Sequence, residues 1–134
     1  MTESELQSKF TKWLKSNWSK GSAAFELKIS QTKKIDHSEF QDHQLLAVTG
    51  ATVDRGVVHK ISDMAAGYKP FDCFILQRAR GYFVLGFNGG ADVFLVDAWA
   101  VWQKVVVPKD RSRRRGSITC LWAMGNGERV QGLG

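Results

Sequence analysis

The stretch Phe25-Glu26-Leu27-Lys28-Ile29 decides how this chain is interpreted. Its apolar residues alternate with charged ones, and this period of two predicts a β-strand with Glu26 and Lys28 on one face. A carboxylate beside a lysine suits phosphodiester cleavage, because carboxylate oxygens hold Mg²⁺ and an ammonium group stabilises charge that develops at phosphate. Most such pairs are solvent-facing ion pairs. The choice between a catalytic pair and an ordinary ion pair therefore depends on the other residues of the chain.

A metal site needs further acids, and the sequence offers three. Asp72 follows Pro70-Phe71 and begins an apolar strand, although aspartate is also a common turn residue. Asp63 lies at the end of the preceding strand and is the substitute for Asp72, although capping the following turn is its simpler role. Glu3 shares the apolar face of the first helix. It either completes the metal site or only stabilises the positive end of that helix, and both interpretations stay open.

The hydrophobic pattern predicts one α/β domain over residues 1–134, with a mixed central sheet flanked by helices. A capping box at Thr2 and Glu5 opens an amphipathic helix. A second capping box, Ser38 with Gln41, predicts a helix of about ten residues that carries Gln44. The first strand is expected over residues 23–30.

The second half of the chain is expected to be richer in strands. A strand is predicted over residues 57–61, a hairpin over 72–77 and 82–87, and a further strand over 93–96. Residues 97–107 fit either a helix or a strand. A short helix over residues 117–124 should end at Gly125, and residues 126–134 are expected to form a flexible tail.

The net charge of +6 favours a polyanionic partner, with nucleic acid as the first expectation. Six basic residues are the predicted phosphate contacts, with an ordinary solvated surface as the alternative: Lys33, Lys34, Arg111, Arg113, Arg114 and Arg115. Cys73 and Cys120 have no metal-ligand spacing, and we expect both to be reduced and in or near the core. No apolar run reaches the ~20 residues of a membrane span, so a cytoplasmic protein without membrane contact is expected.

Four pieces of the chain resemble the PD-(D/E)XK nuclease superfamily, and within it the small Holliday-junction resolvases of archaeal, RecU-type and phage origin. They lie within the first ninety residues: Glu3-x-x-Leu6-Gln7, Phe25-Glu26-Leu27-Lys28, Phe40-x-x-His43-Gln44 and Pro70-Phe71-Asp72. One feature departs from the family pattern. The family places its proline-aspartate strand before E-x-K, whereas here Asp72 follows it.

The resemblance implies a metal-dependent endonuclease. Glu3, Glu26 and Asp72 would bind Mg²⁺, for which Mn²⁺ could substitute, while Lys28 would assist the attack of water and Gln44 would support the site. The implied substrate is branched DNA, above all the four-way junction, cut by a homodimer that a phage or a cell encodes. The alternatives are a related nuclease acting on flaps, ends or duplex DNA, and a basic nucleic-acid-binding module without catalysis.

Overall fold

The predicted first strand forms β1 (Ala23–Ile29), which lies at the edge of the main sheet in this computed structural model. The structure describes residues 1–62, 69–106 and 116–133. The strand order of the main sheet is β1, β5 (Arg80–Phe87), β6 (Asp92–Asp97) and β8 (Gly127–Arg129). β1 runs parallel to β5, whereas β6 is antiparallel to both β5 and β8. The expected α/β class with a mixed sheet is therefore confirmed.

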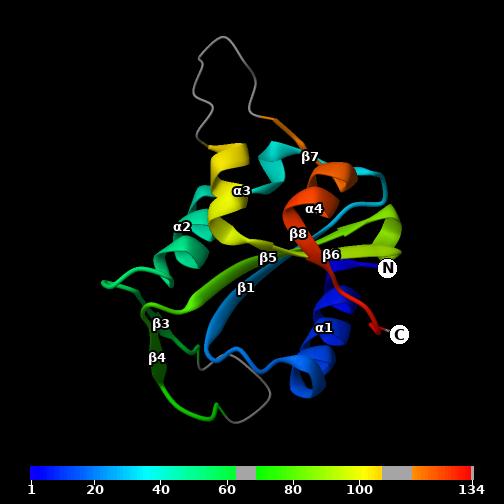
Figure 1. Cartoon of the computed structure of the whole chain (residues 1–134). Coiled ribbons are helices and arrows are strands. Elements are labelled where there is room, and N and C mark those ends of the chain that lie inside the picture. Colours follow the sequence, from blue (N-terminus) through cyan, green and yellow to red (C-terminus); the bar gives the residue numbers. More distant parts are fainter. Residues whose placement is uncertain (63–68, 107–115, 134) are drawn as a thin grey trace.

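Helices cover both faces of this sheet (Figure 1). On one face lies α1 (Glu3–Asn17), whose Leu6 and Phe10 pack with Phe25 and Leu27 of β1. The opposite face is covered by α2 (Asp42–Gly50), α3 (Ala98–Val105) and α4 (Cys120–Asn126). The core therefore has two layers, one on each side of the sheet.

Short elements complete the described chain. Two small antiparallel sheets pair β2 (Lys34–Ile35) with β7 (Ile118–Thr119), and β3 (Val57–Lys60) with β4 (Cys73–Leu76). Two single 3₁₀ turns are η1 (His37–Glu39) and η2 (Asn88–Gly90). Of the two cysteines, Cys120 is buried as expected, whereas Cys73 is exposed on β4.

The predicted hairpin of residues 72–77 with 82–87 is wrong. β4 pairs with β3, and β5 instead runs between β1 and β6. Residues 78 and 79 do not turn back on β4, because their amides bind the loop after α2: Arg78 N donates to Val53 O at 3.1 Å, and Ala79 N donates to Ala51 O at 3.0 Å. Phe83 and Leu85 are fully buried on one face and Val84 on the other, as expected of a central strand with both faces covered.

The starts of three helices test the capping predictions. Thr2 caps α1 as expected, because Glu5 N donates to its hydroxyl oxygen at 3.2 Å. α3 is a helix rather than a strand, and Asp97 accepts a hydrogen bond from Trp99 N at its start. The second capping box is wrong. Asp36 caps η1 by accepting from Ser38 N, so α2 begins only at Asp42.

The C-terminal segment is a strand and not the expected tail. α4 continues through Gly125 to Asn126, and β8 then pairs with β6. Beyond β8, Val130 N donates to Val93 O at 2.8 Å and the Val130 side chain is buried. The sequence does not reveal this strand for two reasons. Its apolar residues are sparse among the glycines, and its partner strand is distant in sequence.

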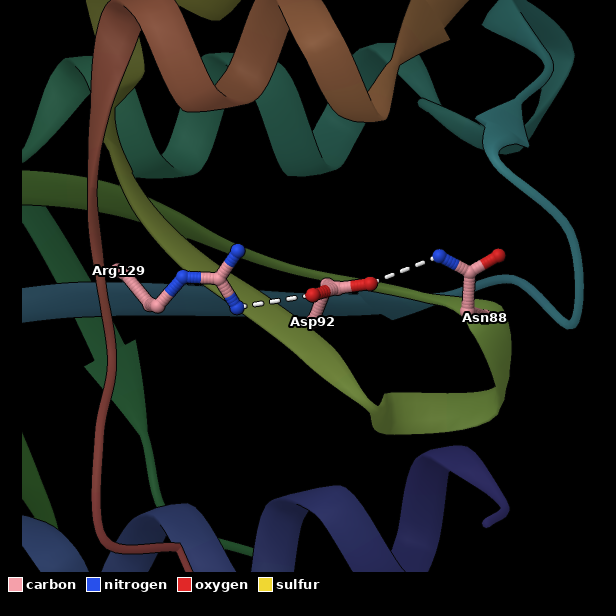
Figure 2. Close-up of polar contacts among 3 residues, drawn as sticks. All are labelled: Asn88, Asp92 and Arg129. Atoms are coloured by element: carbon pink, nitrogen blue, oxygen red, sulfur yellow. Dashed lines mark hydrogen bonds and ion pairs between the residues drawn. The ribbon is translucent and has the colours of Figure 1, made fainter.

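A polar cluster ties β8 to the turn between β5 and β6 (Figure 2). Arg129 Nη1 donates to Asp92 Oδ1 at 2.8 Å, and Asn88 Nδ2 donates to Asp92 Oδ2 at 2.8 Å. These hydrogen bonds, first from Arg129 and then from Asn88, lower the pKa of Asp92. Asn88 itself takes a left-handed conformation with φ 55°, which asparagine tolerates in turns.

Val130→Ala tests the position of the C-terminal segment. Removing two methyl groups from a buried site should lower the free energy of unfolding by about 2 kcal/mol, measured by urea denaturation. Glu128→Ala, on the exposed side of β8, is the matched control and should change it little. Equal stability of the wild type and Val130→Ala would mean that this segment is a frayed tail after all.

Candidate active site

Glu26 and Lys28 lie side by side on the face of β1 that is turned toward α2. Their neighbours Phe25 and Leu27 belong to the core cluster of α1 on the other face, so the predicted alternation is confirmed. Lys28 Nζ lies 3.7 Å from Glu26 Oε1, and the two side chains are 10% and 27% exposed. A lysine this buried is not a solvent-facing ion-pair partner, which was the ordinary interpretation of the motif.

Gln44 joins this pair from the first turn of α2. Its Nε2 amide donates to Glu26 Oε1 at 2.9 Å. Its own carbonyl oxygen, Oε1, is buried and has no hydrogen-bond partner among the described residues. The structure therefore brings together three of the predicted residues from β1 and α2. The carbonyl oxygen of Gln44 remains a buried acceptor without a donor among the described residues.

Burial, more than the surrounding charges, shifts the pKa of the Glu26 carboxyl group. Burial raises the pKa of Glu26, and the negative charge of Glu3 raises it further, while Lys28 and His43 oppose the shift. Glu3 acts from the start of α1, on the other side of the sheet. The predicted acid of the first helix is thus within electrostatic reach of Glu26.

His43 is a residue whose place in the cluster the sequence interpretation missed. His43 is exposed, and its positive charge opposes the rise in the pKa of Glu26. The signal that would have found it is its place beside Gln44 in the first turn of the helix.

Asp72 is not brought to this cluster. It precedes β4 in the two-stranded β3–β4 sheet, its side chain is 87% exposed, and its Oδ1 lies 3.0 Å from Lys69 Nζ. It is also absent from the charges that shift the pKa of Glu26. Because β4 pairs with β3 and not with the main sheet, the residue that precedes β4 is not held beside β1. The substitute acid, Asp63, lies outside the described residues.

Of the six predicted phosphate contacts, two lie among the described residues and four lie outside them. Lys33 and Lys34 are exposed, and they follow the end of β1 closely in the chain. Lys34 is held in β2 by pairing with Thr119, and Lys33 O accepts from Cys120 N. The four arginines at 111, 113, 114 and 115 lie outside the described residues.

The oxygen donors at this site fit a hard divalent cation. In the parts of the chain that the structure describes, no three His, Cys, Asp or Glu residues are grouped to hold a metal. Mg²⁺ does not require such a group, because it often takes one or two protein oxygens and fills the other positions with water and substrate phosphates. Glu26 and the buried, unpartnered Gln44 Oε1 are such oxygens, with Glu3 as a second nearby charge.

Glu26→Gln should stabilise the protein at alkaline pH. Folding raises the pKa of Glu26. The contribution of this group to stability is therefore fully present below its ordinary pKa of 4.5, and it is lost as the pH rises through the raised pKa. Glutamine mimics the protonated form at every pH. The variant should therefore have the larger free energy of unfolding at about pH 8, and the difference should shrink toward zero near pH 4.

Urea denaturation across this pH range is the measurement, with Glu128→Gln on an exposed strand position as the control. A variant that is less stable than the wild type at about pH 8 would show that Lys28 and Gln44 favour the ionised carboxylate more than burial opposes it.

Comparison with known proteins adds no family to this geometry. No protein-family model, no curated protein and no solved structure matches the chain. Among the described residues, no helix has both the length and the apolar character that crossing a membrane requires.

Proposed function

We propose that this protein is a Mg²⁺-dependent DNA endonuclease that hydrolyses phosphodiester bonds in branched DNA, with the four-way junction as its main substrate. The observation that carries the proposal is the cluster of Glu26, Lys28 and Gln44, in which a buried lysine and an amide both contact one carboxylate. A structural ion pair would not need the unpartnered amide oxygen beside it.

Each residue of the cluster has a distinct role in the proposed reaction. Glu26, with Gln44 Oε1 and the nearby charge of Glu3, would hold Mg²⁺. When bound, this ion supplies Lewis acidity and lowers the pKa of coordinated water. The Lys28 ammonium group lies 3.7 Å from the Glu26 carboxylate and would stabilise the negative charge that builds up on the phosphate. Gln44 orients Glu26 through its 2.9 Å hydrogen bond.

The substrate follows from charge and from the resemblance to junction resolvases. A net charge of +6 favours a polyanion, and Lys33 and Lys34 offer exposed ammonium groups beyond the end of β1. The preference for a branched substrate rests on the resemblance alone. Such phosphate contacts hold the backbone of any DNA, so they account for affinity and not for choice between structures.

The test compares Glu26→Gln with Asp72→Asn on a labelled four-way junction, matching duplex, flap and single strand, in Mg²⁺ or EDTA. The wild type should nick the junction only with Mg²⁺. Glu26→Gln should lose at least about 100-fold in cleavage rate and still bind the junction in EDTA. Asp72→Asn should cleave nearly as well as the wild type, because Asp72 is exposed and pairs with Lys69.

Two outcomes would contradict the proposal. Junction binding without cleavage in Mg²⁺ or Mn²⁺ would leave a non-catalytic binding module. Loss of cleavage in Asp72→Asn, with Glu26→Gln active, would place the metal site on the β3–β4 sheet and not on β1. Cleavage of flaps or duplex in preference to junctions would keep the chemistry and change the substrate.

Gln44→Ala tests the orienting role of the amide. Without the hydrogen bond to Glu26, the cleavage rate should fall about 10- to 100-fold, as is typical when a supporting residue of a metal site is removed. Gln41→Ala is the matched control, since Gln41 precedes α2 without a side-chain capping bond. Equal rates for the two variants would exclude Gln44 from the reaction.

A further inference from the structure

The outer edge of β1 carries backbone groups that the described chain does not use. At the two ends of the strand, Arg80 N donates to Ser22 O and Ser30 N donates to Gly86 O. Because backbone groups alternate in direction along a strand, Ala24, Glu26 and Lys28 also face β5. Phe25 and Leu27 therefore direct their N–H and C=O groups away from the sheet.

These outward groups make no hydrogen bond within residues 1–62, 69–106 and 116–133. The pairing with β5 is continuous from Ala23 to Ile29, so no bulge twists the edge away, and β1 contains no proline. Natural proteins usually protect an edge of this kind, because a straight edge strand is a template for another strand. Because β1 has neither a bulge nor a proline, and its only charges are one acid and one lysine that a second strand can complement, this edge points to a partner strand.

We propose that β1 pairs with β1 of a second copy of this chain, antiparallel and centred on Leu27. Three symmetric registers near the middle of the strand would match the outward groups of both copies. Centring on Glu26 places the two Glu26 carboxylates opposite each other, which is unfavourable. Centring on Phe25 places Glu26 opposite the partner's Ala24, which gives no charge contact.

The register centred on Leu27 is the one that complements charge. It places Glu26 directly opposite the partner's Lys28, and Lys28 opposite the partner's Glu26. Together with the 3.7 Å pair within each strand, the four charges then alternate in sign. The two main sheets become one continuous sheet around a two-fold axis, and the partner contributes a lysine to each candidate site.

Antiparallel pairing of identical strands also fixes how the two sites are oriented. Residues that lie opposite each other in such a pair point to the same face. Both clusters of Glu26, Lys28 and Gln44 therefore open on the same side of the joined sheet, the side that α2 covers. This dimer does not depend on the proposed nuclease activity, although it would present two cleavage sites to one DNA.

Amide hydrogen exchange of the wild-type protein, followed by NMR, tests the interface without any substitution. At about 1 mM protein, the amides of Phe25 and Leu27 should exchange at least roughly tenfold more slowly than at about 10 µM, as dissociation exposes them. The amides of Glu26 and Lys28, which are bonded to β5, are internal controls and should stay protected at both concentrations. Fast exchange of Phe25 and Leu27 at every concentration would overturn the proposal, even if the protein is a dimer.

Charge reversal then tests the register. Glu26→Lys and Lys28→Glu each place like charges opposite each other and should shift the protein to monomer in analytical ultracentrifugation, whereas the double variant restores the alternation and should dimerise again. Near-ultraviolet circular dichroism of the tryptophans checks that each variant is folded. Dimerisation by both folded single variants would show that another surface joins the copies, and a monomeric wild type at about 1 mM would exclude the dimer altogether. None of these readouts requires cleavage, so they stand apart from the test of activity.

Discussion

The parallel pairing of β1 with β5 determines where the chain between these two strands must run. Parallel neighbours cannot be joined by a tight turn, so the chain must leave the sheet after Ile29 and return at Arg80. α2 lies within that crossover and packs closely on the sheet: a Cβ atom on Gly81 would lie only 2.5 Å from the carbonyl oxygen of Val48. This close approach brings the first turn of α2, and with it Gln44, over Glu26.

The cluster on β1 is not arranged for stability. Burial raises the pKa of Glu26 in spite of Lys28 beside it, and the Gln44 carbonyl oxygen is buried without a partner. An apolar residue in place of such a buried pair is often neutral or stabilising, so a buried ion pair is weak evidence of a structural role. Perturbed charges and unsatisfied polar atoms gather at functional sites, where local rules are broken for the sake of chemistry.

Local features of this fold could be predicted from the sequence, and non-local ones could not. The alternation in Phe25-Glu26-Leu27-Lys28-Ile29, the Thr2 cap and the strand expected over residues 93–96 follow from neighbouring residues, and the structure confirms them. The partners of β4 and β8 depend on distant strands, which a single sequence does not encode locally. Glu26, Lys28 and Gln44 do lie close together as predicted, whereas Asp72, which precedes β4, lies elsewhere.

We propose that the carboxylate of Glu26 forms part of a divalent cation site. Carboxyl carbon NMR of the wild-type protein during a Mg²⁺ titration tests it most directly, because each aspartate and glutamate reports separately. We expect a saturable chemical-shift change at Glu26, a smaller one at Glu3, and none at the exposed Asp72 that precedes β4. A shift at Asp72 with Glu26 unmoved, or no saturable shift at any carboxyl group, would contradict it.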